Sequence, residues 1–575
     1  MTATADTAGA SATSGKLQRA IDWKGAFWVA SGVPPLVLFS IGGIAGTTGK
    51  LAFLVWIISM VMGFVQSFTY AEIAGMFGSK SGGASVYGAT AWLRYSKFIA
   101  PLSVWCNWFA WSPVLSLGSA IAAGYIINML APIPIFSEQS PEVVAWLADP
   151  ANVGKSAADA IAAVTAAATP AIRAWSLASF PIPGLAQANL NATFFIGLVL
   201  LLIVFAIQHR GILGTANVQK VFAVIVLVPL LIIGLWPIVN GSINYVNFTN
   251  LVPPVAAYSA EPGQWNIGGW TLFLGGLYIA AWSTYAFETA ICYTSELKNP
   301  ANDTIKAILA AGLLCMLFYF LVPFTFQGVL GVEGMLAPGI VDGTGIGHAL
   351  AAMVGAGPFI TQILVILMIF ALMLAIMTAM AGSSRTLYQG SVDGWLPKYL
   401  SHVNSHGAPT YAMFTDLAFN IFLLAIASDL AGYFFVLAVS NAGYMIFNFL
   451  NLNAGWIHRV DSGHVKRPWK APTWLIGLNT VLAFVNAIFL GAGAKVWGYQ
   501  NALWVGFAFA ALIIPVFAYR HYVTDKGKFP PNMLTELGLK GTDLGQRKAG
   551  IWPYVTLAAG LAVVLVANLI FVLPG

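Results

Sequence analysis

Long apolar runs, each followed by a short polar stretch, repeat along almost the whole chain. About 20 mostly apolar residues are enough to cross the hydrocarbon core of a bilayer as an α-helix. Runs of this length predict thirteen spanning helices, which begin near Gly25, Leu51, Phe98, Ala192, Asn217, Gly268, Ala307, Pro358, Tyr411, Gly432, Thr473, Ala502 and Ile551. The runs do not alternate with polar residues, which excludes an outer-membrane β-barrel. The predicted fold class is therefore an all-α membrane protein.

The amino-acid composition supports this fold class. Charged residues make up 8% of the 575 residues, and hydrophobic residues make up 59%. Soluble proteins carry about 25% charged residues, so the apolar side chains here exceed what a soluble core can bury. The lipid membrane is a predicted partner, and the net charge of +6 is interpreted as an orientation signal and not as a nucleic-acid surface.

Basic residues indicate the orientation, because cytoplasmic loops of membrane proteins are enriched in Lys and Arg. If the N-terminus is cytoplasmic, 22 of the 26 Lys and Arg fall on the cytoplasmic side. The four on the external side are Lys50, Lys155, Arg173 and Lys495. Thirteen spans then place the C-terminus outside.

Charged side chains inside the apolar runs are costly and are therefore functional candidates. Glu72 lies at the inner end of the second span, Asp416 lies near the inner end of the ninth, and Glu288 lies well inside the sixth. Lys220 and Arg385 lie near inner ends, from which a long side chain can reach the headgroups. Glu288, the deepest, either couples transport to a proton or ties neighbouring helices together by hydrogen bonds.

The first span contains the sequence ASGVPP at residues 30–35, which cannot continue as a helix because two prolines remove two backbone donors. Proline is tolerated in a first helical turn, so the helix is expected to restart at the prolines. The break would leave backbone groups of Ser31, Gly32 and Val33 free at the positive end of a half-helix, which suits a carboxylate. A simple proline kink is the alternative.

Polar and aromatic residues gather at mid-membrane depth in the sixth span, in the sequence WSTYAFE. Interrupted helices at corresponding positions of two halves indicate a transporter binding site, and the third span adds candidates in VWCNWFAW. The predicted substrate-binding residues are Ser31, Gly32, Val33, Asn107, Trp111, Trp282, Ser283, Thr284, Tyr285 and Phe287. Packing is the alternative for the tryptophans, whereas Asn107 needs a polar partner in lipid.

No catalytic or metal motif accompanies these residues. The seven histidines lie in loops or at helix ends, and the sequence contains no HExxH, GxSxG or P-loop motif. We therefore predict a transporter without a cofactor or metal, and not an enzyme. Without a P-loop, transport would use a gradient or exchange.

Four segments, in the same order, resemble the amino acid–polyamine–organocation superfamily of permeases. They are YAEIAGMFGSKSGGASVYGATAWL, AFETAICYTSELKNPANDTIKAI, SRTLYQGSVDGWLPKYLSHVNSHGAPTYA and RPWKAP. The resemblance implies a five-plus-five inverted-repeat fold with broken first and sixth helices. It also implies a substrate site between the first, third, sixth, eighth and tenth helices. Some members use a lysine in the fifth span in place of a sodium ion, and Lys220, nearer the helix end, is the candidate for that coupling role here.

The spans and the resemblance together predict the domain organisation. Its parts are a disordered cytoplasmic tail (1–22), a first five-helix repeat (23–245) with a long external loop (132–190), a second, inverted repeat (246–457), helices 11 and 12 (473–520), a cytoplasmic linker (521–550) and a thirteenth helix (551–575). Short surface helices are expected in the external loop, because Asp159 and Pro170 interrupt its run of small residues.

The predicted function is that of a secondary transporter in the plasma membrane. It would move an amino acid or a related amine by alternating access, coupled to a proton or to a counter-flux of substrate. The alternative is an ion-uptake protein or channel of similar fold, for example one for potassium. Saturable binding and counterflow would distinguish the carrier from a channel.

Overall fold

The structure is a computed structural model that describes residues 17–132, 138–183, 186–337, 339–341, 343–497, 501–539 and 543–574. Most of the tail predicted to be disordered, residues 1–16, lies outside these ranges, and so does Lys540.

Helices dominate the described residues, and a helix overlaps each of the predicted spans. The helices of the bundle are α1 (Trp23–Ala30), α2 (Val37–Thr48), α3 (Ala52–Gly75), α5 (Ala100–Trp111), α6 (Val114–Leu130), α10 (Ala192–Gln208), α11 (Ile212–Val239), α12 (Ile267–Thr284), α13 (Pro300–Met335), α15 (Pro358–Val392), α16 (Thr410–Ala427), α17 (Leu430–Asp461), α18 (Thr473–Gly493), α19 (Ala502–Ala511), α20 (Ile513–Ala518) and α21 (Trp552–Ile570). The shorter helices are α4 (Ala84–Leu93), which is buried against α5 and α17, and α7 (Pro141–Ala148), α8 (Ala157–Ala168), α9 (Ala171–Ala174) and α14 (Ile346–Met353).

Ten helical segments of the described residues are long and apolar enough to cross a membrane. One of them, Trp23–Gly75, covers two of the predicted spans. The predicted spans near Ala192 and Gly268 correspond to α10, which has 17 residues, and to α12, which is not among the ten. The chain is thus a multi-pass membrane protein, and the count of thirteen stays a prediction.

Both predicted helix interruptions are present. The first span ends as α1 at Ala30 and restarts through a 3-10 turn, Pro34–Leu36, into α2, with prolines at the first two positions of the turn. The sixth span ends as α12 at Thr284 and continues as the 3-10 turns η5 (Ala286–Ile291) and η6 (Thr294–Glu296). The first break follows from proline, whereas the second contains none.

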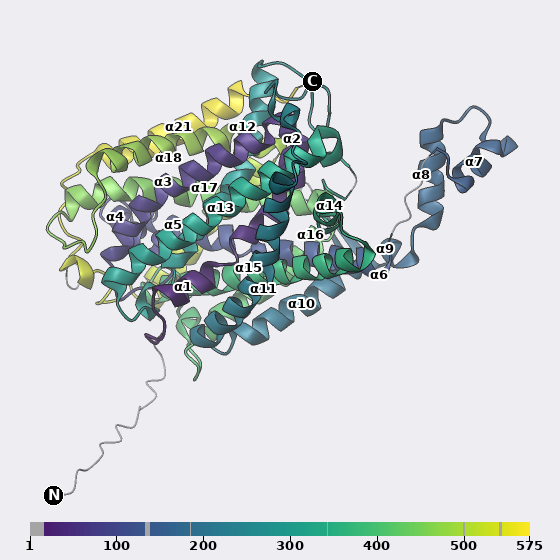
Figure 1. The fold of residues 1–575 in the computed structure, drawn as a ribbon. Coiled ribbons are helices and arrows are strands. Elements are labelled where there is room, and N and C mark those ends of the chain that lie inside the picture. Colours follow the sequence, from purple (N-terminus) through teal and green to yellow (C-terminus); the bar gives the residue numbers. More distant parts are fainter. Residues whose placement is uncertain are drawn as a thin grey trace, which may run out of the picture.

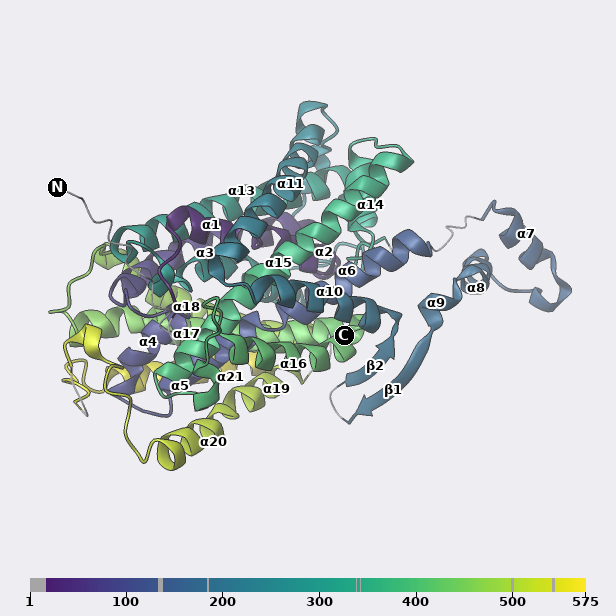
Figure 2. The same ribbon diagram turned by 90° about the horizontal axis from the view of Figure 1, so that it is seen from below.

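Contacts between helices far apart in sequence build the core of the bundle. The helix α3 packs along α13, α6 packs along α15, and α5 packs along α17. Figures 1 and 2 show that α7, α8 and α9 project from one end of the bundle, while α4 lies at the opposite end. This agrees with a long loop on one face, although the orientation and the domain boundaries stay predictions.

The loop predicted to hold short helices also contains an antiparallel hairpin, which the sequence analysis did not predict. Its strands are β1 (Ser176–Ile182) and β2 (Ala186–Asn191), paired through Phe180 and Ala188. The amide of Asn189 in β2 donates to the carboxylate of Asp429 at 2.8 Å. This contact ties the hairpin to the start of α17, and such a long-range contact leaves no local sequence signal.

The orientation can be tested by cysteine labelling. Lys155 follows α7 in the projecting loop, Lys470 precedes α18, and both side chains are exposed. The native cysteines, Cys106, Cys292 and Cys315, are buried. An impermeant maleimide added to intact cells is expected to label Lys155→Cys and to leave Lys470→Cys unlabelled until the cells are permeabilised. Labelling of Lys470→Cys from outside would contradict the predicted orientation.

Candidate functional site

The backbone N–H groups at the first break all have partners. Ser31 donates to the carbonyl of Trp28 at 3.3 Å, and Val33 donates to that of Ala30 at 3.1 Å. Gly32 donates to the hydroxyl of Thr378 in α15 at 3.1 Å. The expectation of free donors at this break is therefore wrong for this conformation, because short backbone turns and one hydroxyl of α15 satisfy them.

Gly32 allows α1 to approach α15 at close range. A Cβ at this position would lie 2.3 Å from both the carbonyl oxygen of Leu374 and the hydroxyl of Thr378. Thr378 in turn donates to the carbonyl of Val29 at 2.6 Å. The glycine is therefore required for packing between two helices, which differs from the predicted contact with ligand.

The fifth span reaches this junction through Gln219. Its amide donates to the Thr378 hydroxyl at 3.0 Å and to the Val29 carbonyl at 3.2 Å. The neighbouring Lys220, predicted as a coupling residue, has an exposed side chain on α11. Adjacent positions of a helix point about 100° apart, so Gln219 and not Lys220 joins the junction of α1, α11 and α15.

The two interruptions meet at one tyrosine of α13. The hydroxyl oxygen of Tyr319 lies 2.8 Å from the carbonyl oxygen of Val33 and 3.2 Å from that of Ser283. A tyrosine hydroxyl has a single proton to donate. It can therefore serve one of the two carbonyls at a time, and the other is available to accept a hydrogen bond.

Glu288 lies in η5, and its carboxyl group is fully buried. Its Oε1 accepts from the indole of Trp111 at 2.9 Å and from the amide of Asn107 at 3.4 Å. Its Oε2 has no hydrogen-bond partner among the described residues. A buried carboxylate with one unsatisfied oxygen is unfavourable, so this oxygen is suited to take a proton or the donor of a ligand.

The third span lies between Glu288 and a second buried carboxyl group, that of Asp416 in α16. Asn107 and Trp111, four residues apart, contact Glu288, whereas Trp108 and Ser112, also four apart, contact Asp416. Residues at this spacing share one face of a helix. Two neighbouring faces of α5 therefore each meet one carboxyl group.

The Asp416 carboxyl group differs from that of Glu288 in its hydrogen bonding. Its Oδ1 accepts from Trp108 at 3.0 Å and from Ser112, and its Oδ2 accepts from Ser383 in α15. Both oxygens are thus satisfied, which is typical of a carboxylate with a structural role.

Several predicted site residues of the sixth span face other helices. The indole of Trp282 donates to the carbonyl of Ala110 in α5 at 3.1 Å. Thr284 pairs with Ser59 of α3. The hydroxyl of Tyr285 donates to Asn486 of α18, and the ring of Phe287 lies beside that of Phe64 in α3. The structure thus brings together Asn107, Trp111 and Glu288, and Trp282 of α12 contacts the same turn of α5 through the Ala110 carbonyl.

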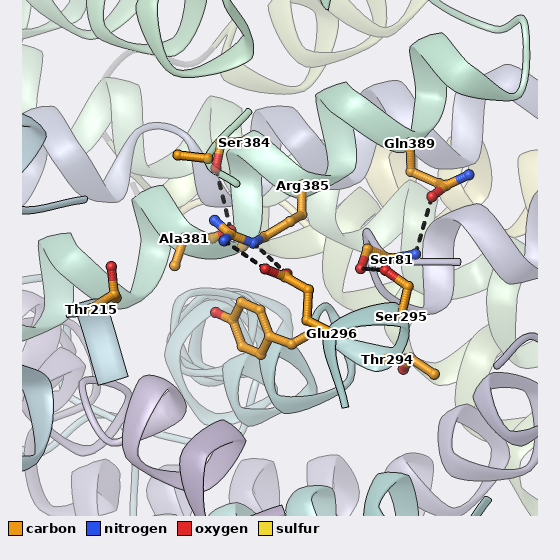
Figure 3. Close-up of polar contacts among 12 residues, drawn as sticks. Ser81, Thr215, Thr294, Ser295, Glu296, Ala381, Ser384, Arg385 and Gln389 are labelled. Carbon is orange, nitrogen blue, oxygen red and sulfur yellow. Dashed lines mark hydrogen bonds and ion pairs between the residues drawn. The ribbon is translucent and has the colours of Figure 1, made fainter. Parts of the chain in front are cut away.

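A buried ion pair lies where the sixth and eighth spans end on the predicted cytoplasmic face. The carboxylate of Glu296 in η6 binds the guanidinium of Arg385 in α15 through two contacts of 2.8 and 3.1 Å (Figure 3). Alongside it, the hydroxyls of Ser81 and Ser295 lie 2.6 Å apart, and Ser81 N–H donates to Gln389.

The segment before α1 contacts the backbone of Glu296, one member of this ion pair. The N–H groups of Ala20 and Ile21 both lie within hydrogen-bonding distance, 3.0 and 3.2 Å, of the carbonyl oxygen of Glu296. The chain ahead of the first span, the end of the sixth span and the eighth span are therefore held together on one face.

The described residues contain no group of three or more His, Cys, Asp or Glu side chains placed to hold a metal ion.

Comparison with known proteins assigns the family. The family model for amino acid permeases matches residues 21–517. The chain belongs to the amino acid permease family. This confirms the resemblance drawn from the four sequence segments, and it is a family of transporters and not of enzymes.

Two curated permeases of Lactococcus lactis subsp. cremoris (strain MG1363) are similar to this chain. The branched-chain amino acid permease BcaP is 22% identical over 336 residues, which cover 56% of this chain and 65% of BcaP. The lysine-specific permease LysP is 24% identical over 385 residues, which cover 62% of this chain and 70% of LysP. The match to BcaP thus spans slightly less than two thirds of that relative.

Sequence reasoning missed three residues that organise the site of this amino acid permease: Gln219, Tyr319 and Thr378. All three are neutral polar side chains inside apolar runs. A search for charged residues does not find them. A search for buried hydroxyl and amide groups at the depth of the two breaks would have selected them, because such groups need partners in the membrane.

Proposed function

We propose that this amino acid permease is a secondary transporter for an amino acid or a related amine and that it works by alternating access. The convergence of both helix interruptions on Tyr319 carries this proposal. The hydroxyl can donate to the Val33 carbonyl or to the Ser283 carbonyl, which lie in different spans. Such an exchange would let the hydrogen bond change its partner as the first and sixth spans move relative to each other, which supports two conformations in equilibrium.

The proposed substrate site lies between the first break, the third span and the sixth span. Asn107 and Trp111 form one side of it, and Glu288 forms another, with its unsatisfied Oε2. The carbonyls of Val33 and Ser283 each accept a backbone N–H, and the one to which Tyr319 does not donate has a second lone pair that is suited to an ammonium group. A ligand amine could therefore supply the hydrogen bond that Glu288 Oε2 lacks and add one to that carbonyl.

Glu288 is also the proposed coupling residue. A proton on Oε2 would remove the charge of this buried group, and its release would restore the charge. Lys220 has no part in this proposal, because its side chain is exposed on α11.

The relatives direct the choice of ligands to test. One is named for branched-chain amino acids and the other for lysine. Neither is more than 24% identical to this chain, so a screen must include both apolar and basic amino acids as well as amines.

A thermal-shift screen followed by counterflow tests the proposal. A ligand at about 100 times its Kd stabilises the folded state by about 2.7 kcal/mol if it does not bind the unfolded state. We expect an L-amino acid or an amine to raise Tm, with the D-enantiomer as control, and to show counterflow in proteoliposomes. Potassium flux without any amino acid, together with no ligand shift, would support the ion-uptake alternative instead.

A further inference from the structure

The chain continues beyond the family match, which ends at residue 517. Residues 525–539, here called the strap, follow the end of the twelfth span and lie on the predicted cytoplasmic face. The side chains of Met533 and Leu537 in the strap are 2% and 1% exposed. Burial of this degree shows that the strap is packed onto the body of the protein.

The strap joins two elements that are distant in sequence. At the end of α15, Pro530 packs so closely that a Cβ on Gly394 would lie 2.8 Å from its Cδ. In the loop after α3, the Glu536 carboxylate of the strap accepts from the Ser79 hydroxyl, and the Met533 carbonyl accepts from the ammonium of Lys80 at 2.7 Å. The strap therefore bridges the second and eighth spans.

A buried ion pair lies directly beneath this bridge. Lys80 contacts both carboxylate oxygens of Asp393 at 2.8 Å, and the two side chains are 4% and 3% exposed. Burial raises the pKa of Asp393 even though the Lys80 ammonium acts to lower it. A buried pair of this kind requires every proton of the ammonium to be satisfied. The third acceptor of Lys80 is the Met533 carbonyl, so the strap completes the pair.

The strap also lines a cleft near the Glu296–Arg385 pair. This cleft, of about 360 Å³, is lined by Met533 and Asn532 of the strap and, on the body, by Ser295 and Gln389. Ser295 and Gln389 contact Ser81, next to that pair (Figure 3). Opening of this face would have to separate contacts that the strap holds together.

The chain after the strap is fixed to the bundle. Downstream, the carbonyl of Leu544 accepts from Arg94 at the end of α4, and the N–H of Ala549 donates to Asp461 at the end of α17. The helix α21 then packs along α18 (Figure 1). The extra helix therefore anchors the strap on the bundle.

We propose that the strap is a built-in latch that holds the predicted cytoplasmic face closed and must release during each transport cycle. This inference rests on the alternating access proposed above. Its chemistry is a buried ion pair, Lys80–Asp393, capped by the Met533 carbonyl, with the apolar side chains of Met533 and Leu537 buried in the same strap. Release of the cap exposes the pair to water and removes the link between the second and eighth spans.

A reversible cross-link tests the need for release. The side chains of Ser79 and Glu536 are in contact, and the native cysteines are buried. Cysteines at both positions, joined by a short reducible bis-methanethiosulfonate linker, are expected to reduce counterflow at least tenfold while ligand still raises Tm. Reduction should restore counterflow, and each single cysteine is the control. Counterflow at the parent rate in the cross-linked protein would overturn the proposal.

A loosened strap gives an independent measurement. Leu537→Ala is expected to increase the labelling rate of a cysteine at the buried Ser81 by about fivefold or more, the scale of typical conformational coupling. Thr535→Ala, at an exposed strap position, is the matched control and should change nothing. If Leu537→Ala does not fold, Glu536→Gln, which weakens the contact with Ser79, replaces it.

The labelling experiment separates the two proposals. If the protein does not work by alternating access, the amino acid or amine found in the thermal-shift screen will not change the labelling rate of Ser81→Cys when the strap carries no substitution. If ligand changes this labelling but neither strap variant does, the latch is wrong and the transport proposal stands.

Discussion

A Glu288→Gln variant is expected to lose concentrative uptake and to keep counterflow of bound substrate. The amide retains an oxygen that can accept from Trp111 and Asn107, so the contacts with the third span can persist. It places an NH₂ group where Oε2 has no hydrogen-bond partner among the described residues. It cannot gain or lose a proton, so movement of substrate would no longer be coupled to the proton gradient.

The measurement compares uptake driven by a pH gradient with counterflow in the same proteoliposomes. Asp416→Asn is the matched control, because Asp416 of α16 is a second buried carboxyl group and contacts the neighbouring face of α5. Its oxygens are already satisfied by Trp108, Ser112 and Ser383. An amide there would leave a donor without its acceptor and lower stability by about 1–3 kcal/mol, with no change in pH dependence. Concentrative uptake by Glu288→Gln with the parent pH dependence would exclude Glu288 from coupling.

The apolar helices and the first break could be predicted because their causes are local. The length of an apolar run determines whether it crosses the membrane, and the pair Pro34–Pro35 interrupts a helix wherever it occurs. The β1–β2 hairpin could not be predicted in this way. It is tied to the start of α17 by the contact between Asn189 and Asp429, which are 240 residues apart.

The candidate site was predicted in part. The charged residue was found from the sequence, whereas several neutral polar residues were not. Glu288 was selected because a carboxyl group inside an apolar run is costly, and its partners Asn107 and Trp111 were selected from the third span. The neutral groups of Gln219 and Tyr319 cost less to bury and were missed. Sequence spacing also could not show that Lys220 points away from the junction that its neighbour joins.

The two buried carboxyl groups suggest a division of roles within the third span. Asp416 holds one face of α5 by accepting from Trp108 and Ser112, and Ser383 satisfies its other oxygen. The other face meets Glu288, whose hydrogen bonding is incomplete. Under the proposed coupling, protonation or ligand binding at Glu288 would act on a helix whose neighbouring face is held by Asp416, which favours movement of the sixth span over movement of α5.

Gly32→Val is expected to abolish uptake through loss of the contact between α1 and α15. A Cβ at this position would lie 2.3 Å from the backbone oxygen of Leu374, and a backbone atom cannot rotate out of the way as a side chain can. Overpacking of this kind costs about 1–3 kcal/mol or more, which α1 can avoid by moving away from Thr378.

The test measures Tm, ligand-induced stabilisation and uptake on one preparation of Gly32→Val. Gly477→Val is the matched control, because Gly477 also lies in a helix of the bundle and a Cβ there would meet no atom within 4 Å. A lower Tm together with lost uptake would assign Gly32 to helix packing. An unchanged Tm with lost ligand stabilisation would instead show that its missing side chain makes room for substrate. Normal uptake would mean that the first break tolerates displacement of α1 and has no part in binding.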